Sequence, residues 1–395
     1  MPKTKQAVEQ AAKLKLYLPQ LDKLESKIHE WMDKEDKYQA MVVRATRYGV
    51  PIFEGCYGTS TNDSGVKMDT IFPVASNTKP IIATLILMLQ EDGCLELSDP
   101  IKKFCPEYTG KGKDEISIWH FLTHTSGIIE DSWLHMTDYI RNELKMELPY
   151  GGATEEECDE YNSRLGRALG LPPEDYKWDK VAEEIERRVK SKARPRSVMS
   201  YCNHGYQKLK DIICAVTGES IDAYAQRVLF EPLGMIDSHW VLPKEKWDRV
   251  LGRGERCMGH GWINSAENYT RESGAGGLKT TVNDMTHFCE MMLGMGKYNN
   301  HRILSPASVR EMTRNWNGEL NPWDAWGLGW NYHSTKVDDA GTLRSERAID
   351  HGGWGGHKIL IDPEYNLSVI TYMADYEGVQ NESCKIYNMV IAACE

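Results

Sequence analysis

Residues 76–90 read SNTKPIIATLILMLQ, a polar start followed by a long apolar run. The run is too short to span a bilayer, so it predicts a helix buried in the core. Ser76 and Lys79 lie three residues apart at its start, and residues at this spacing share one helix face. Lys79 can therefore reach the Ser76 hydroxyl and hold or receive its proton, as an activated serine nucleophile requires. Unpaired N–H groups at the helix start would stabilise an oxyanion there.

Two further segments favour catalysis over the alternative, an N-cap serine beside an exposed lysine. The first is Ser200-Tyr201-Cys202-Asn203, which precedes a helix-favouring stretch. Tyr201 and Asn203 are therefore expected in a loop that leads into a helix. A phenol can relay protons beside a cation, and an amide can orient both a lysine and a substrate carbonyl. Taken alone, this pattern would indicate an ordinary turn.

The second segment is AIDHGGWGGHKILIDPEYNLSVITYMAD at 348–375. It predicts two apolar strands joined by a Pro-Glu-Tyr-Asn turn, with His351, Gly352 and Gly353 at the front of the first strand. Glycines weaken a strand unless something must approach its backbone closely, as an acyl substrate would on pairing with an edge strand. A strand bulge is the alternative explanation.

In this order and spacing, the three segments resemble serine β-lactamases, penicillin-binding proteins and related esterases. The resemblance is to the class C type, with its family VIII-like esterases and related acyltransferases. Further matching stretches are ISIWHFLTHTSGI at 116–128, VLFEPLGMIDSHW at 228–240, GAGGLKTTVNDMTHF at 274–288, RILSPASVREM at 302–312 and WGLGW at 326–330. Roughly nine tenths of the chain, from about residue 20 onward, fits the family's layout. His124 and Ser126, in the first stretch, are expected to shape a loop behind the site.

The resemblance implies a role for each matched residue. Ser76 would be the acylated nucleophile, and Lys79 and Tyr201 would form its proton relay. Asn203 would position Lys79 and the substrate carbonyl. The oxyanion hole would come from the backbone N–H groups of Ser76 and Trp354.

One departure from the family bears on the substrate. β-Lactamases and many peptidases of the family carry Lys-Thr-Gly in the third segment, where the lysine and threonine help to hold a carboxylate. This chain has His351-Gly352-Gly353 instead. A histidine that is neutral near pH 7 is a poor carboxylate anchor, so the departure favours an ester over an anionic acyl donor. These three residues are expected to line the substrate site rather than to bind a metal.

The sequence therefore predicts a serine hydrolase that forms an acyl-enzyme on Ser76. A carboxylesterase or acyltransferase acting on a small-molecule ester or amide is the first interpretation. A D-amino-acid peptidase or weak β-lactamase is the second. A catalytically silent binding protein on the same scaffold is the third, and the complete set of Ser76, Lys79, Tyr201 and Asn203 weighs against it. No motif calls for a cofactor or a metal.

Composition excludes some other classes of function. The 47 lysines and arginines and 58 aspartates and glutamates give a formal net charge of -11, which disfavours nucleic-acid binding. The N-terminal stretch MPKTKQAVEQAAKLKLYLPQ has no continuous apolar segment, so no signal peptide is expected. Ten scattered cysteines without a Cys-x-x-Cys pair fit reduced thiols. We therefore expect a cytoplasmic enzyme without a membrane partner.

The predicted fold class is α/β (α+β), with the antiparallel sheet, flanking helices and all-helical lobe of β-lactamases and transpeptidases. Residues 1–80 and 270–395 are expected to form the α/β lobe, and residues 81–269 the mainly helical lobe, with the site at their junction. The stretches YQAMVVRATRYG and IFEGCYGTST predict two strands around a turn at Gly49-Val50-Pro51. An amphipathic helix on the sheet is predicted by apolar residues at helical spacing, namely Leu21, Leu24, Ile28 and Trp31.

The stretch at about 130–195 departs most from the family. It contains charged, helix-favouring segments separated by Gly151-Gly152 and Pro172-Pro173. It either covers the site and selects the acyl group, or it is a solvated decoration of the helical lobe. If it covers the site, Trp133, Tyr139 and Trp178 are the candidate lining residues.

Overall fold

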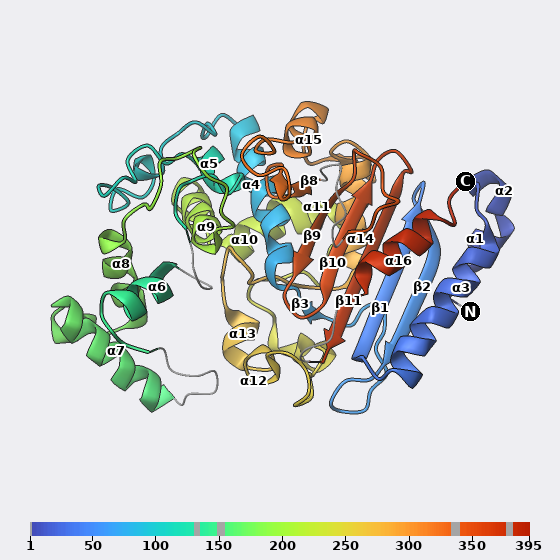
Figure 1. Ribbon diagram of the computed structural model, residues 1–395, viewed down its shortest axis with the longest axis horizontal. Coiled ribbons are helices and arrows are strands. Elements are labelled where there is room, and N and C mark those ends of the chain that lie inside the picture. The colour runs from blue at the N-terminus through green and yellow to red at the C-terminus, as the bar shows by residue number, and fades with distance from the viewer. Residues whose placement is uncertain (1, 130–134, 148–154, 333–339, 377–381) are drawn as a thin grey trace.

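The computed structural model describes residues 2–129, 135–147, 155–332, 340–376 and 382–395 (Figure 1). A seven-stranded antiparallel sheet organises the molecule, in the order β2-β1-β11-β10-β9-β8-β7. Its strands come from both ends of the chain, and all of its pairings are antiparallel, so the predicted antiparallel sheet is confirmed. They are β1 (Tyr38–Arg47), β2 (Val50–Gly58), β7 (Ala325–Trp326), β8 (Asn331–Tyr332), β9 (Ile349–Gly353), β10 (His357–Asp362) and β11 (Leu367–Asp375).

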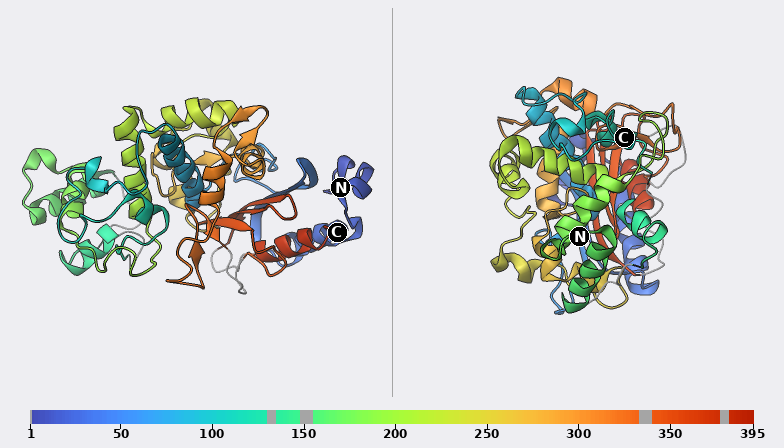
Figure 2. Two further views of the ribbon diagram at one scale, coloured as in Figure 1. Left: turned by 90° about the horizontal axis from the view of Figure 1, so that it is seen from above. Right: turned by 90° about the vertical axis from the view of Figure 1, so that its left-hand side faces the viewer.

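Helices cover both faces of the sheet (Figure 2). The helices α3 (Leu18–His29) and α16 (Ser383–Ile391) share one hydrophobic core with Met41 and Val43 of β1. The helices α4 (Thr78–Glu91) and α14 (Val282–Leu293) share another with Ala40 and Val42. Because successive side chains of a strand point to opposite faces, β1 contributes alternate residues to the two cores.

The N-terminal elements follow the prediction with one shift. Leu21, Leu24 and Ile28 are buried on α3, and Trp31 lies in a π-helical turn that continues the helix. The turn between β1 and β2 is formed by Tyr48 and Gly49, which have φ of 51 and 72. A two-residue hairpin turn of this kind needs positive φ at both positions. The predicted turn was therefore placed too late, and its last two residues already belong to β2, an edge strand in which a proline is tolerated.

The C-terminal segment contains three strands where the sequence predicted two. Trp354, Gly355 and Gly356 form a turn between β9 and β10, and the two glycines have φ of 93 and 90. Glycine adopts such angles without steric cost, so the chain reverses here. His351, Gly352 and Gly353 therefore end a separate strand, which pairs with β8 and β10. The predicted turn at 363–366 between β10 and β11 is present.

The middle of the chain is mainly helical. Its helices are α5 (Ile118–Leu122), α6 (His135–Asn142), α7 (Glu155–Leu169), α8 (Trp178–Arg188), α9 (Asn203–Thr217), α10 (Ile221–Ala225), α11 (Glu231–Leu233), α12 (His260–Ile263) and α13 (Ala266–Thr270). One hydrophobic core includes α4, α9, α14 and the sheet. The division into lobes at residues 80 and 270 stays a prediction.

The remaining elements are short. They are the helices α1 (Lys5–Glu9), α2 (Ala11–Leu14) and α15 (Pro306–Met312), the paired strands β3 (Phe72–Pro73) and β4 (Lys279–Thr280), and the paired strands β5 (Lys297–Tyr298) and β6 (His301–Arg302). None of the helices in the described ranges combines the length and the apolar content that crossing a membrane requires.

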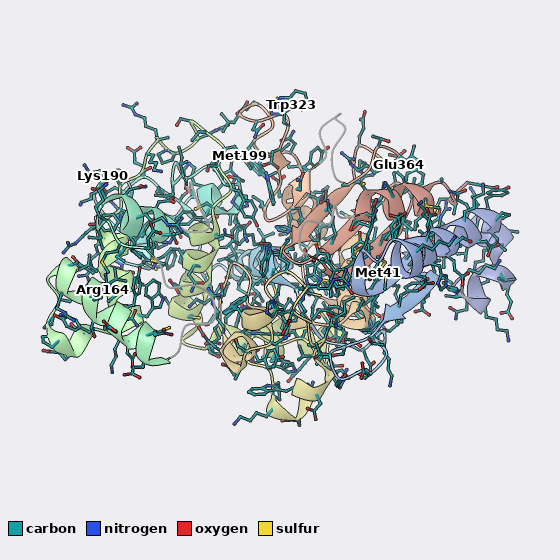
Figure 3. The ribbon with its side chains drawn as sticks, turned by 60° about the horizontal axis from the view of Figure 1, so that its bottom comes forward. Met41, Arg164, Lys190, Met199, Trp323 and Glu364 are labelled. Atoms are coloured by element: carbon teal, nitrogen blue, oxygen red, sulfur yellow. The ribbon has the colours of Figure 1, made fainter. Side chains whose placement is uncertain are left out.

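The helices α6, α7 and α8 lie together at one end of the molecule, where Arg164 and Lys190 project (Figures 1 and 3). They enclose a small core of their own, formed by Ile140, Tyr161, Leu165, Leu169, Val181 and Ile185. An ion pair of 2.6 Å between Glu186 and Lys208 joins α8 to α9. Trp178 is 43% exposed, Tyr139 is half-buried, and Trp133 lies outside the described residues.

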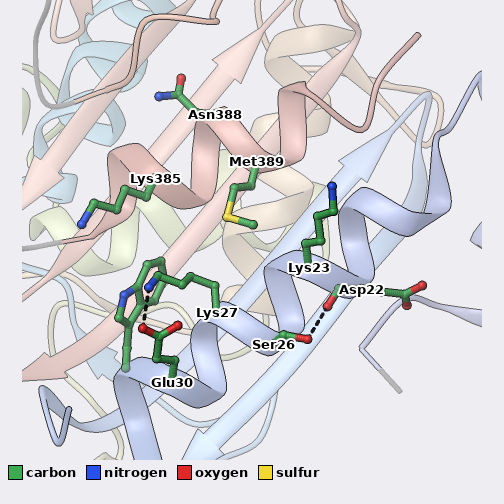
Figure 4. A pocket seen from close by; sticks show the side chains of 9 residues that line it. Asp22, Lys23, Ser26, Lys27, Glu30, Lys385, Asn388 and Met389 are labelled. Carbon is green, nitrogen blue, oxygen red and sulfur yellow. Dashed lines mark hydrogen bonds and ion pairs between the residues drawn. The ribbon is translucent and has the colours of Figure 1, made fainter. Parts of the chain in front are cut away.

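A cavity of about 610 Å³ lies between α3 and α16 (Figure 4). Lys27 and Glu30 line it and form an ion pair of 2.8 Å. Lys385 and Met389 line it from α16. Because α4 packs in the core of the opposite sheet face, the sheet separates this cavity from Ser76.

Candidate active site

Ser76 lies in a tight turn directly before α4. Ala75, Ser76 and Asn77 form one 3₁₀ turn, and α4 begins at the next residue. Ala75 has φ of 47, a left-handed conformation that is uncommon for a residue with a Cβ. Thr78 Oγ1 donates to Ala75 O at 2.7 Å and accepts from Leu278 N at 3.0 Å. The turn is thus fixed to the segment before β4, and the Ser76 side chain remains partly exposed.

Lys79 is fully buried on the first turn of α4. Its Nζ lies 3.1 Å from Ser76 Oγ, 2.9 Å from Asn203 Oδ1 and 2.8 Å from Ala275 O. The two carbonyl oxygens can only accept hydrogen bonds. A neutral amine that donates its N–H groups to these oxygens can accept the proton of the Ser76 hydroxyl with its lone pair. In the ammonium form the third proton points to Ser76 Oγ instead, so one proton can pass between the two atoms.

Asn203 reaches Lys79 because it is the first residue of α9. Cys202 caps this helix, since its Sγ accepts the Gly205 N–H at 3.4 Å. The Cys202 N–H in turn donates to His124 Nδ1 at 3.0 Å. Tyr201 lies in the predicted loop, but Asn203 already belongs to α9, so the prediction placed Asn203 one residue too early. The end of the loop is fixed on both sides, by its own helix and by the segment that contains His124.

Aromatic rings place Tyr201 beside Lys79. Lys79 Nζ lies 4.7 Å from the centroid of the Tyr201 ring. The His124 ring stacks on Tyr201 at 4.5 Å with an interplanar angle of 29°. The Trp326 ring contacts His124 at 4.6 Å and Tyr201 at 5.5 Å. The structure thus brings Ser76, Lys79, Tyr201 and Asn203 together, and their individual roles stay predictions.

Two buried histidines near Lys79 are neutral at pH 7. Burial, and then the charge of Lys79, lowers the pKa of His351 to about 3. The same causes, followed by His351, hold the pKa of His124 well below its ordinary value. His351 Nδ1 lies 2.7 Å from Gly352 O, and a carbonyl can only accept, so Nδ1 carries the proton. The third segment therefore places an uncharged side chain beside the site.

β9 approaches the Ser76 turn through a glycine. A Cβ on Gly353 would lie 2.3 Å from Val74 O, so a larger residue does not fit without movement. Gly352 is exposed, and a Cβ there would meet no described atom within 4 Å. Trp354 follows directly, and its indole covers Gly259, where a Cβ would lie 2.0 Å from Trp354 Cη2. The backbone of Trp354 is thus held near the turn that carries Ser76.

Sequence reasoning missed several contributors to this site. It gave no role to Trp326, and it expected His124 only to shape a loop, although His124 supports the Tyr201 ring directly. It also missed Ala275, because a backbone carbonyl leaves no side-chain signal. The run of glycines around Ala275 is the one visible sign, since a Cβ on Gly274 would lie 2.2 Å from Tyr206 O. In the described part of the chain, no three His, Cys, Asp or Glu side chains are grouped as metal ligands would be.

The fold and the assembled side chains are those of one family. The family model described as Beta-lactamase matches residues 21–392. The chain belongs to the β-lactamase family and is a serine hydrolase. The resemblance and the fold class predicted from the sequence are therefore confirmed.

Three similar proteins illustrate the range of the family. Esterase EstB from Burkholderia gladioli is 27% identical over 380 residues, which are 88% of this chain and 88% of the esterase. A putative D-alanyl-D-alanine carboxypeptidase from Escherichia coli (strain K12) is 24% identical over 331 residues, 76% of this chain and 68% of that protein. The solved structure of EstCE1, a hydrolase with promiscuous acyltransferase activity, gives a TM-score of 0.71 at 18% identity and covers 94% of this chain and 99% of its own.

Proposed function

We propose that this protein is a carboxylesterase or acyltransferase that forms an acyl-enzyme on Ser76. The observation that carries the proposal is the position of Lys79 Nζ, 3.1 Å from Ser76 Oγ with two carbonyl acceptors on its other sides. This arrangement lets the lysine take up the serine proton without moving. The similarity to esterase EstB supports the same interpretation.

The proposed reaction has two acyl-transfer steps. Ser76 Oγ attacks the ester carbonyl while its proton passes to the pair formed by Lys79 and Tyr201. The backbone N–H groups of Ser76 and Trp354 stabilise the oxyanion of the tetrahedral intermediate. The intermediate collapses, the C–O bond to the leaving alcohol breaks, and the pair returns the proton to that oxygen. The same pair then deprotonates water or a second alcohol, which takes the acyl group from Ser76.

An uncharged acyl donor is the substrate class that we propose. His351 stands where lactamases and peptidases of the family carry a cationic lysine, and its pKa of about 3 leaves it neutral at pH 7. A neutral imidazole offers no fixed charge to a substrate carboxylate. EstCE1 combines hydrolysis with promiscuous acyltransferase activity, which motivates testing an alcohol as the second acceptor here.

A D-amino-acid peptidase or weak β-lactamase is the second candidate. The observation that favours it is the similarity to putative D-alanyl-D-alanine carboxypeptidases. Its substrates would present a carboxylate, which the neutral His351 disfavours. The silent binding protein requires that the contact between Lys79 and Ser76 has no chemical use, so we place it last. A cytoplasmic location stays a prediction.

A panel of acyl donors tests the proposal. p-Nitrophenyl esters of acetate, butyrate and octanoate are compared with a chromogenic cephalosporin and a D-alanyl-D-alanine peptide, with and without an added alcohol. We expect the largest kcat/KM with an ester and loss of that activity in Ser76→Ala. Faster opening of the cephalosporin or cleavage of the peptide would favour the second candidate. Ester turnover that survives in Ser76→Ala would contradict the mechanism.

A further inference from the structure

Arg253 is a buried arginine for which the mechanism above has no role. It lies between the 3₁₀ turn Lys244–Arg249 and α12, and only 2% of it is exposed. Its backbone is clamped by one side chain, since Asn264 Oδ1 accepts the Arg253 N–H at 2.9 Å and Asn264 Nδ2 donates to Arg253 O at 2.8 Å. The starting point of the long side chain is therefore fixed.

The guanidinium of Arg253 lies beneath the turn between β9 and β10. Its Nη2 lies 3.0 Å from Gly355 O, 3.1 Å from Met373 O and 3.0 Å from His357 Nε2, so its two N–H groups are shared among three acceptors. A guanidinium cannot accept, so His357 Nε2 is the acceptor and His357 is neutral. Burial, followed by the charge of Arg253, holds the pKa of His357 well below its ordinary value. One nitrogen thus joins the turn to the ends of β10 and β11.

The shape of the turn is fitted to this guanidinium. Gly355 has φ of 93, and a Cβ there would lie 2.6 Å from Arg253 Nη1. Gly355 follows Trp354, and Gly353, which precedes it, lies against Val74 O close to Ser76. The Trp354 peptide is therefore held between two glycines, one fixed by the Ser76 turn and one by Arg253.

A buried cation is a costly way to fill this space. Desolvation of a charge costs several kcal/mol, and an apolar side chain of similar volume is often as stable or more stable. The carboxylate of Asp375 is 3.8 Å from Arg253 Nη1, beyond hydrogen-bonding distance. What an apolar residue cannot replace is the fork of N–H groups, which reaches the carbonyl of Gly355 in the turn and the carbonyl of Met373 in β11. In return for its desolvation cost, the buried guanidinium therefore holds the backbone in position.

We propose that Arg253 is a positioning residue for the oxyanion hole, because it fixes the turn at 354–356 and so the direction of the Trp354 N–H. The inference rests on the proposed function, in which this N–H stabilises the oxyanion. A group that acts only in this way supports the tetrahedral state more than the bound substrate.

Variants at Arg253 test the inference. Arg253→Gln keeps one amide donor and removes the fork, and Arg253→Lys keeps the charge but not the planar geometry. Removal of a whole oxyanion donor lowers kcat by about 100-fold to 1,000-fold. We expect displacement of the donor in Arg253→Gln to lower kcat/KM for a p-nitrophenyl ester by about 10-fold to 100-fold, with partial recovery in Arg253→Lys. Rates are expressed per active site, from the end-point stoichiometry of phosphonate labelling.

A pair of inhibitors separates positioning from general loss of structure. A trifluoromethyl ketone reacts with Ser76 Oγ to form a tetrahedral adduct, whereas the matching methyl ketone binds mainly without reacting. In Arg253→Gln the affinity for the trifluoromethyl ketone should fall in proportion to kcat/KM, and the affinity for the methyl ketone should change little. Arg47→Gln is the matched control, because Arg47 is also 2% exposed and donates to two carbonyls, Lys15 O and Glu395 O, beside the C-terminus.

The outcomes distinguish this inference from the proposed function. If Arg253→Gln and Arg253→Lys keep the wild-type rate per labelled site, or if the affinities for both ketones fall equally, Arg253 has no positioning role. An equal loss per labelled site in Arg47→Gln would also overturn it. If the wild-type protein turns over no ester and labels no serine, the proposed function fails and the inference falls with it.

Discussion

At the scale of single residues, the proposed mechanism depends on the amine of Lys79. Replacing Lys79 with methionine keeps most of the volume but removes the group that takes the Ser76 proton. General base catalysis contributes about 100-fold to 10,000-fold, so we expect kcat/KM for a p-nitrophenyl ester to fall by that range. Initial rates measured beside Ser76→Ala check this. A Lys79→Met protein that keeps more than a tenth of the wild-type rate would show that another group is the base.

The lowered pKa of His351 predicts how the stability of the folded protein changes with pH. Its pKa is about 3 in the folded state and about 6.5 when unfolded, so the unfolded state binds more protons between these values. Stability is therefore lost as the pH falls below about 6.5. From pH 7 to pH 5 this single group should cost the folded state about 2 kcal/mol.

The variant His351→Asn removes this titration. Carboxyls whose pKa burial raises, such as Glu290 to about 7 and Asp284 to about 6, act in the opposite direction but are common to both proteins. Urea unfolding at the two pH values should therefore show that the wild type loses about 2 kcal/mol more than the variant. Equal losses in the two proteins would mean that His351 is not held neutral by its surroundings.

At the scale of elements, the hairpin of β9 and β10 offers a matched pair of substitutions. Gly353→Ala places a Cβ 2.3 Å from Val74 O, whereas Gly352→Ala meets no described atom within 4 Å. Overpacking of this kind costs about 1–3 kcal/mol, so Gly353→Ala should lower the free energy of unfolding by that amount while Gly352→Ala changes it little. Thermal and urea unfolding of the two variants measure the difference. Equal stability would mean that β9 does not press against the Ser76 turn.

The same hairpin shows what the sequence could predict about elements. The apolar residues at helical spacing located α3, and apolar runs located β1, β10 and β11, whose residues are buried on both faces of the sheet. The separate strand β9 was missed because its own sequence, Ile349–Gly353, has little apolar pattern. Gly355-Gly356 was the turn signal that could have revealed it. The turn after β1 was misplaced for a related reason, since Tyr48 gives no hint that it adopts positive φ.

Site residues were predictable where a side chain makes the contact. Ser76 and Lys79 form one local motif, Tyr201 and Asn203 form another, and the structure brings all four together. Ala275 and Arg253 were not predictable. One acts through a backbone carbonyl, and the other acts on carbonyls distant in the sequence, so neither contact follows from local spacing.

At the scale of the whole molecule, α6, α7 and α8 pack around a small core of their own. Their core contains six buried apolar side chains, apart from the continuous core that joins α4, α9 and the sheet. Small clusters open more readily than large ones, so we expect amides of these helices to exchange with deuterium much faster than those of β1 and β11. Protection equal to that of the two strands would show that α6–α8 unfold only with the rest of the protein.

The ion pair between Glu186 and Lys208 provides a second readout of the same feature. Burial raises the pKa of Glu186, and the 2.6 Å contact with Lys208 opposes that shift. Lys208→Met removes the partner and should leave α8 less protected, because an uncompensated buried carboxylate destabilises its surroundings. Exchange in β1 and β11 should be unchanged. A uniform increase across the molecule would show that α8 is not a separate unit.

The most direct measurement is the identification of the residue that becomes acylated. The protein is mixed with a fluorophosphonate or a slow p-nitrophenyl ester, quenched, and analysed by intact mass and peptide mapping. The proposed mechanism predicts one adduct per chain, on Ser76, which is absent from Ser76→Ala and forms more slowly in Lys79→Met. An adduct on another residue, or ester turnover with no adduct on Ser76, would contradict it.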